Sequence, residues 1–224
     1  MSLNKRLIAS GPAPFVASEN FTTVTWEGDE QDDREITVGF KPDFVWFKTR
    51  NQSNDHNLSD STRGAAKQIR PNRDIAEVSA SDQIKSFTST GFTVGTSGDS
   101  NRAGNTYVAW CWKVGGGTTS SNTDGSGITS TVQSNADTGI SIVKWTGTAN
   151  ASHTVGHGLG TTPDVIMLKD YSNTRNWMVH VSAAPTVNQP FGGNLDLNTT
   201  FNTNAGTNGG FGTPTSSVIT FTNG

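Results

Sequence analysis

The chain has 224 residues, of which Gly, Thr, Ser and Asn supply 100, while hydrophobic residues make up 32% and charged residues 16%. This composition argues against helical bundles, coiled coils and doubly wound α/β enzymes, which need Ala, Leu, Glu and Lys in long periodic runs. The net charge of −3 gives no basic field for nucleic acid or an anionic membrane, and no stretch approaches the roughly 20 apolar residues of a membrane span.

Residues 1–20 are predicted to form an N-terminal arm, because Pro12 and Pro14 block regular strand pairing. Apolar patterns predict four strands after this arm. They lie at 21–28, 42–50, 86–95 (around a turn at Gly91) and 106–114. The second and the fourth are apolar on both faces, which is typical of central strands in a sandwich.

Two segments lack strand patterns. Residues 51–86 predict a long loop with a short helix, which Pro71 limits to about two turns. Residues 115–138 are rich in Gly, Ser and Thr and predict a flexible linker. The expected organisation is therefore a first β-sandwich at 21–114, the linker, and a second β unit at 139–224.

The second unit repeats the first. Trp26 and Gly28 recur as Trp145 and Gly147 at an offset of 119, and the run 42–48 (PDFVWFK) recurs as 163–169 (PDVIMLK) at an offset of 121. Such ordered matches indicate an internal duplication. The strand TYVAWCW of the first copy has no counterpart in the second. We therefore expect the second copy to lack its last core strand, which another chain or a continuation of the gene product would supply.

Several polar groups are candidates for chemistry. Asp29, Glu30, Asp32 and Asp33 could bind Ca²⁺, although a solvated hairpin loop is favoured because their spacing specifies no geometry. His153 and His157 have zinc-like spacing, but four strand residues span about 13 Å, too far for one metal.

Residues 55–63 contain side chains that could take part in acid–base chemistry, and no catalytic motif accompanies them. These are Asp55, His56, Asp60 and Arg63. An isolated Asp–His pair usually stabilises a turn. Asp43 and Asp164 occupy the same repeat position, which indicates a structural turn or strand-start role. We predict no catalytic residue, no metal and no cofactor.

The aromatic residues and the single cysteine are expected to serve packing. Five of the six tryptophans lie in strand patterns, and Cys111 lies in an apolar run, so all are predicted to be core. Trp177, with Arg175 and His180, is the candidate for a surface contact. Because aromatic rings can stack on the apolar faces of sugars, a lectin function is an alternative hypothesis.

A string of motifs carries a family resemblance. It consists of GFKPDFVWFK (39–48), DSTRGA (60–65), TSTGFTVG (88–95), TYVAWCWK (106–113), SNTDGS (121–126) and GHGL (156–159). The chain resembles a repeat module of marine bacteriophage virion proteins, described as tail-fibre-like or concanavalin-A-like. The resemblance implies an all-β, antiparallel sandwich of jelly-roll kind, duplicated in tandem, and a location in the virion. The apolar stretch 7–9 is too short for a signal peptide, so synthesis in the host cytoplasm is expected.

We therefore expect a non-enzymatic virion structural protein, a tail fibre or similar appendage that recognises the host surface. A capsid decoration or head fibre protein is one alternative, and a lectin or glycan hydrolase on the same fold is another. The expected partners are other virion proteins, further copies of the chain (a trimer is favoured) and a host-surface glycan, without nucleic acid or membrane insertion. The arm would dock onto the particle through a few basic and apolar residues. These are Leu3, Lys5, Arg6, Leu7 and Ile8.

Overall fold

A computed structural model describes residues 16–148, 152–182, 193–195 and 210–222. In these residues the fold is all-β, as expected, and the only helical element is the short 3₁₀ turn η1 (Ala17–Glu19). No helix among them is long and apolar enough to cross a membrane. The first-half strands are β1 (Phe21–Glu27), β2 (Arg34–Thr37), β3 (Phe44–Thr49), β4 (Asn57–Asp60), β5 (Lys67–Ile69), β6 (Val78–Ser79), β7 (Ile84–Phe87), β8 (Gly91–Val94) and β9 (Thr106–Trp112).

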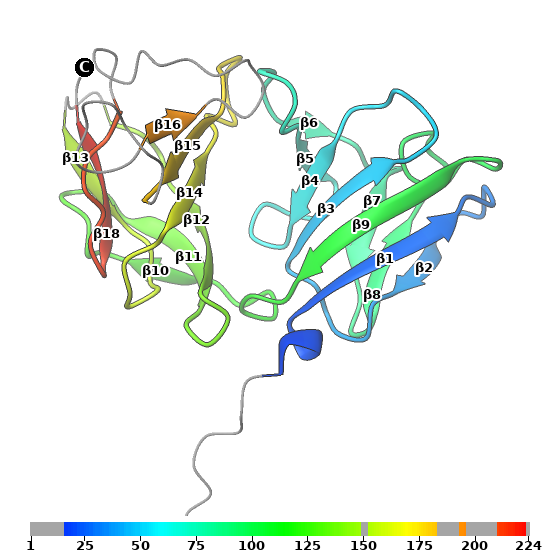
Figure 1. Cartoon of the computed structure of the whole chain (residues 1–224), viewed down its shortest axis with the longest axis horizontal. Coiled ribbons are helices and arrows are strands. Elements are labelled where there is room, and N and C mark those ends of the chain that lie inside the picture. Colours follow the sequence, from blue (N-terminus) through cyan, green and yellow to red (C-terminus); the bar gives the residue numbers. More distant parts are fainter. Residues whose placement is uncertain (1–15, 149–151, 183–192, 196–209, 223–224) are drawn as a thin grey trace, which may run out of the picture.

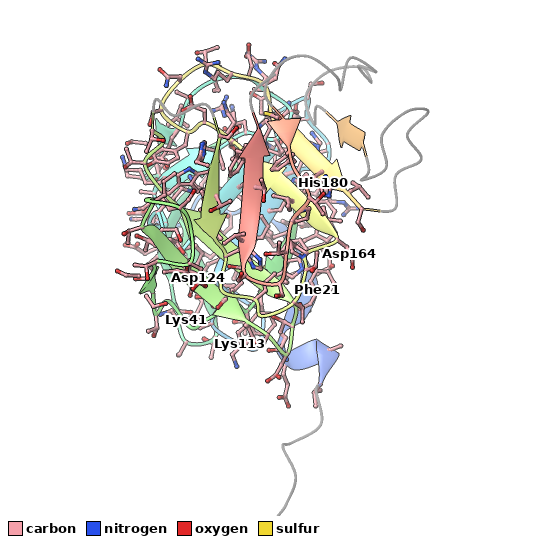
Figure 2. All side chains as sticks on the ribbon, turned by 90° about the vertical axis from the view of Figure 1, so that its left-hand side faces the viewer. Phe21, Lys41, Lys113, Asp124, Asp164 and His180 are labelled. Atoms are coloured by element: carbon pink, nitrogen blue, oxygen red, sulfur yellow. The ribbon has the colours of Figure 1, made fainter. Side chains whose placement is uncertain are left out.

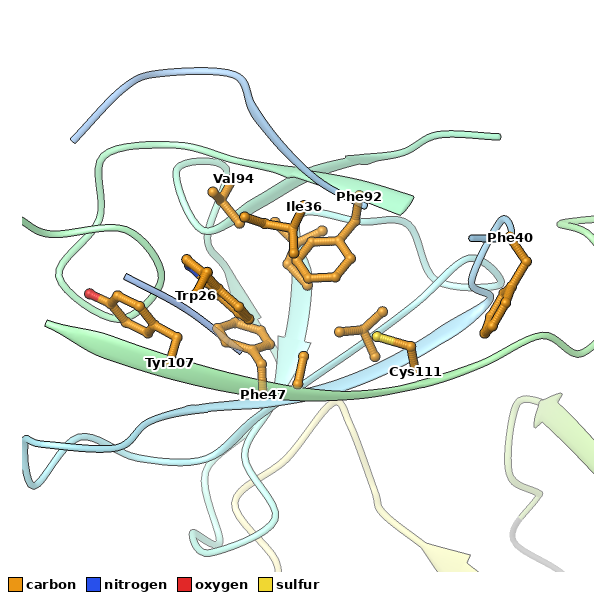
Figure 3. Packing of buried hydrophobic residues seen from close by; sticks show 11 residues of the cluster. Trp26, Ile36, Phe40, Phe47, Phe92, Val94, Tyr107 and Cys111 are labelled. Atoms are coloured by element: carbon orange, nitrogen blue, oxygen red, sulfur yellow. The ribbon is translucent and has the colours of Figure 1, made fainter. Parts of the chain in front are cut away.

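The first half is a sandwich of two antiparallel sheets (Figure 1). One sheet has the order β1-β9-β3-β4-β5-β6, and the other has the order β2-β8-β7. Alternate residues of β1, β3 and β9 point inward and meet the second sheet. The buried cluster between the sheets is Trp26, Ile36, Phe40, Val45, Phe47, Ile84, Phe92, Val94, Tyr107, Ala109 and Cys111 (Figure 3).

The predicted strands are confirmed where the sequence is apolar. β9 lies between β1 and β3, pairing Trp110 with Thr23 on one side and with Trp46 on the other. The two runs that are apolar on both faces are thus the central strands of the sheet. Cys111 is fully buried, and this burial raises the pKa of its thiol to about 12. It behaves as a small core residue rather than as a nucleophile.

The prediction of a loop and helix for 51–86 was wrong. Strands β4, β5 and β6 lie in this segment and extend the large sheet, and they are followed by β7. Polar residues such as Asn57, Ser59 and Gln68 are buried there. The strands are held by backbone pairing beside β3, so their side chains carry no apolar pattern that sequence reasoning could detect.

The prediction of a linker for 115–138 also needs correction. This segment contains β10 (Ser120–Asn122) and β11 (Ser130–Asn135), which pair with each other, and β11 pairs in turn with β12 (Ile140–Lys144). The segment forms a sheet with the second half instead of separating the two halves. Its many Ser and Thr residues are compatible with a β-ladder, whose hydrogen bonds come from the backbone.

The second half contains two further three-stranded sheets, with the orders β13-β18-β17 and β14-β15-β16. Their strands are β13 (His153–Gly156), β14 (Val165–Leu168), β15 (Met178–Val181), β16 (Gly193–Leu195), β17 (Gly210–Phe211) and β18 (Val218–Thr222).

The two halves are joined by hydrogen bonds between their loops. The N–H of Arg175 donates to the carbonyl of Asp74 (2.8 Å), and that of Glu77 donates to the carbonyl of Tyr171 (2.8 Å). The Lys169 ammonium adds a bond to the same Asp74 carbonyl (3.0 Å). The loop before β6 and the loop between β14 and β15 therefore fix the contact between the halves.

Candidate functional site

The outer face of the large sheet carries a row of three aromatic rings from three neighbouring strands. The register places Phe21 of β1 beside Trp112 of β9, and Trp112 beside Phe44 of β3. The ring centroids of Phe21 and Trp112 are 5.0 Å apart, and those of Trp112 and Phe44 are 5.2 Å apart. Phe21, where η1 leads into β1 (Figure 2), is 41% exposed. The row is thus an apolar strip that solvent reaches.

A second row lies one pleat further along the same face. Trp110 and Trp46 are register partners whose ring centroids are 6.2 Å apart at 71°. The Trp46 indole N–H donates to Nδ1 of His56 (2.9 Å). We call Phe21, Phe44, Trp46, Trp110 and Trp112 the aromatic face. Its five rings are fixed by the pleat of three paired strands, so the surface is preformed.

Two indole N–H groups of the aromatic face remain available. Among the described residues, the N–H groups of Trp110 and Trp112 have no hydrogen-bond acceptor, whereas Trp26 of the core donates to the carbonyl of Ser100 (2.9 Å). Flat rings next to free donors can stack on an apolar surface and hydrogen-bond its polar groups at the same time. The aromatic face is therefore suited to binding.

His56 orients Trp46 by accepting the hydrogen bond of its indole N–H. Because an indole N–H can only donate, Nδ1 of His56 must be unprotonated to accept its hydrogen bond. Burial, followed by the nearby Lys48 charge, holds the pKa of His56 below its ordinary value of 6.5, against an opposing effect of Asp55. The folded state therefore binds this proton less readily than the unfolded chain does.

We expect acidification below pH 6.5 to weaken the fold through His56. Because the pKa of His56 is lower in the folded state than in the unfolded chain, its contribution to stability is complete above the unfolded-state pKa. That contribution is lost as the pH falls through the folded-state pKa. Loss of the hydrogen bond to Trp46 should cost about 1 kcal/mol. Urea unfolding at pH 7.5 and 5.5 tests this, with His56→Asn as the control that does not titrate. His180, whose pKa burial also lowers, contributes equally to both proteins. An identical pH dependence in wild type and variant would contradict the assignment.

The acid–base candidates of 55–63 are occupied by structural contacts. Asp55 accepts hydrogen bonds from Arg70 (2.8 Å) and Asn72 (2.7 Å) and not from His56. Asp60 pairs with Arg63 (2.6 Å), whose guanidinium also meets Glu77 (2.9 Å) and lies 7% exposed. These ion pairs connect the carboxylates of the segment to neighbouring arginines, so the segment is a brace for β4.

The acidic run does not form a hairpin. It connects β1 to β2, which belong to different sheets, so the hairpin interpretation was wrong. Asp29 contacts Arg34 (3.3 Å), while Asp32 and Asp33 contact Lys85 (2.7 and 2.9 Å). Arg34 lies in β2 and Lys85 in β7, so the paired carboxylates attach this connection to the smaller sheet.

The two histidines of the zinc-like spacing have separate surroundings. His153 stacks on Phe221, with ring centroids 4.9 Å apart. His157 is buried, with Nε2 3.1 Å from the carbonyl of Thr215 and Nδ1 accepting from the N–H of Leu159. No group of three or more metal-ligating side chains occurs in the part of the chain that the structure describes.

Asp43 and Asp164 have the structural role that their repeat position predicted. The buried carboxylate of Asp43 accepts from the Ser61 hydroxyl (2.9 Å) and from the N–H groups of Val114 (2.8 Å) and Gly116 (2.7 Å). Asp164 accepts from the Ser182 hydroxyl (2.7 Å). Each aspartate thus connects the start of one strand to the end of the next.

Comparison with known proteins assigns the family. A family model described as a domain of unknown function, DUF7483, matches residues 16–224. The chain belongs to the DUF7483 family. No curated protein matches it. No solved structure matches it either.

The surface contact expected at 175–180 of this DUF7483 domain needs correction. Trp177 is 2% exposed and its indole donates to the carbonyl of Arg70 (2.8 Å), and His180 is also buried. Trp177 thus packs at the contact between the halves. Of these three residues only Arg175 is exposed, and its Nε lies 3.4 Å from a carboxylate oxygen of Asp170. The anchor residues Leu3, Lys5, Arg6, Leu7 and Ile8 lie outside the described residues.

The aromatic face of the DUF7483 domain was missed because its tryptophans were assigned to the core. Trp26 is buried as predicted, but Trp46, Trp110 and Trp112 are only half-buried and point outward. The signal was present in the two strands that are apolar on both faces. In a two-layer sandwich only one face of a strand can meet the second sheet, so the other apolar face must lie outside.

Proposed function

We propose that the protein is a non-enzymatic structural protein of a bacteriophage virion, a tail fibre or similar appendage whose aromatic face contacts the host surface. The observation that carries this proposal is the preformed aromatic face, with two free indole donors beside rings that solvent reaches. Surface polysaccharides offer the matching chemistry, because sugar rings have apolar faces edged by hydroxyls. The engagement of Asp55, Asp60 and Arg63 in structural contacts supports binding rather than catalysis.

The finer fold proposal is a tandem duplication of a jelly-roll or concanavalin-A-like unit. Matching strand registers support it. In the first half β3 and β4 pair Phe44 with Asp60, and in the second half β14 and β15 pair Val165 with Val181. Each residue of the second pair therefore lies 121 positions after its counterpart in the first pair. The sheet orders β3-β4-β5 and β14-β15-β16 correspond, as do β2-β8-β7 and β13-β18-β17.

Side-chain contacts support the same duplication. The Ser61 hydroxyl donates to Asp43, and the Ser182 hydroxyl donates to Asp164, each serine standing 18 residues after its aspartate. The N–H of each serine also donates to the carbonyl of the same aspartate, at 2.8 Å in both halves. Two such pairs at one offset are better explained by a repeated unit than by convergence.

Within the particle, residues 1–20 dock onto other virion proteins and the β units face outward. The assembly is a homo-oligomer, with a trimer favoured, since fibres cover exposed strand edges by association. An electron-microscopy map of an intact particle should place the chain in a tail appendage. Deletion of residues 1–20 should abolish its incorporation, and normal incorporation of the truncated chain would refute the docking role. Density on the head would favour the capsid decoration alternative.

A further inference from the structure

The second half presents a free strand edge. In the part of the chain that the structure describes, β14 pairs with β15 and with no other strand. Two of its four residues, Val165 and Met167, are 57% and 42% exposed. Val16 and Phe21 are the only other large hydrophobic residues that are exposed in this part. Exposed apolar residues on an unpaired edge are a feature that proteins usually avoid or cover.

The backbone of β14 shows which groups face the free edge. The N–H of Ser182 donates to the carbonyl of Asp164, so the even-numbered residues direct their backbone groups toward β15. In an antiparallel ladder the direction alternates from one residue to the next. The N–H and C=O groups of Val165 and Met167 therefore point away from β15, as a neighbouring strand would require.

The first half contains the same edge with a strand on it. There the N–H of Ser61 donates to the carbonyl of Asp43, so Phe44 and Trp46 direct their backbone groups away from β4. β9 lies on that side and pairs with β3 over six residues. Its Trp112 and Trp110 cover Phe44 and Trp46, whose counterparts at the offset of 121 are Val165 and Met167.

We propose that the free edge of β14 accepts an antiparallel strand from a different polypeptide, with large apolar side chains opposite Val165 and Met167. This extends the interface of β9 with β3, which the first half already contains, to the second half. Main-chain hydrogen bonds to the edge would supply affinity, and the two apolar positions would supply specificity. The proposal rests on the tandem duplication and is independent of the virion assignment.

A second copy of this chain is a weaker occupant. The strand that fits the edge by its pattern, β9, is held between β1 and β3 in its own sheet. A separate donor strand that carries aromatic residues covers more apolar surface.

A peptide with the sequence of residues 105–114 tests the proposal. It carries Ser at the position of Cys111, two added lysines for solubility and a fluorophore, and its anisotropy is measured against the full chain. We expect saturable binding that Met167→Pro weakens at least about tenfold, because the variant loses one main-chain hydrogen bond to the edge and the apolar contact of the Met167 side chain. Proline removes only the N–H that faces the free edge, so the ladder with β15 survives.

Thr23→Pro is the matched control. The N–H of Gly28 donates to the carbonyl of Asn105, so even-numbered residues of β1 face β9 and the N–H of Thr23 points to the free side. This variant should bind the peptide with unchanged affinity, and a scrambled peptide should not bind.

Three results would overturn the proposal. One is no saturable binding, and another is equal binding by Met167→Pro and wild type, as expected if the peptide merely exchanged with β9. The third is a dimer in sedimentation that Met167→Pro dissociates, because this would assign the edge to a second copy. None of them bears on where the protein lies in the particle.

Discussion

Replacing Arg63 with methionine is expected to destabilise the fold by about 3 kcal/mol, because it leaves two carboxylates in a buried site without their cation. The Arg63 side chain is 7% exposed and meets Asp60 at 2.6 Å and Glu77 at 2.9 Å. It also donates to the carbonyl of Leu58 in β4 (3.2 Å). Urea denaturation monitored by circular dichroism measures the change.

Two further variants separate this effect from a general loss of an arginine. Arg175→Met removes an ion pair whose arginine side chain is 72% exposed, and it should cost no more than about 0.5 kcal/mol. Adding Asp60→Asn and Glu77→Gln to Arg63→Met should restore part of the stability, since the buried charges are then gone. Equal losses for Arg63→Met and Arg175→Met would show that the buried cluster does not brace β4.

Replacing Asp43 with alanine should cost about 3 kcal/mol. The N–H groups of Val114 and Gly116 both donate to its buried carboxylate, and each buried donor left without a partner costs about 1–3 kcal/mol. These bonds attach the end of the β9 segment to the start of β3, so the loss is expected in the first half. The same denaturation experiment measures it.

Asp164→Ala is the matched variant in the second half, because Asp164, like Asp43, accepts a hydrogen bond from a serine 18 residues later. Asp164 accepts one side-chain hydrogen bond, from Ser182, at an exposed site. We expect a loss of about 1 kcal/mol or less. A larger loss for Asp164→Ala than for Asp43→Ala would mean that the buried N–H groups are not what makes Asp43 important.

The sequence predicted the strands that are rich in apolar residues. β1 and β8 carry apolar residues on alternate positions, β3 and β9 are apolar on both faces, and all four strands lie within a few residues of their predicted positions. β4, β5 and β11 were not found, because their buried residues include Asn57, Gln68 and Gln133. Backbone pairing with a neighbouring strand places these residues, and a local pattern of polarity does not record that pairing.

The candidate site was less predictable than the fold. Which face of β3 and β9 meets the second sheet depends on where β2, β7 and β8 pack, and this is a tertiary property. Sequence reasoning could therefore not separate Trp26, inside the sandwich, from Trp46 and Trp110, outside it. Trp177 was predicted at the surface and is buried, for the same reason. The carbonyl that accepts the hydrogen bond of its indole N–H belongs to Arg70, which is 107 residues away in the sequence.

We expect the aromatic face to bind carbohydrate on a host surface, and a titration with polysaccharide measures this binding. Soluble bacterial surface polysaccharides are added to the protein while its tryptophan fluorescence is followed, for wild type, Trp110→Ala and Tyr171→Ala, a control outside the face. Thermal unfolding confirms that each variant is folded. We predict saturable binding by wild type and Tyr171→Ala and a loss of about tenfold or more in affinity for Trp110→Ala. Undiminished affinity of a folded Trp110→Ala, or no binding by wild type, would contradict the claim.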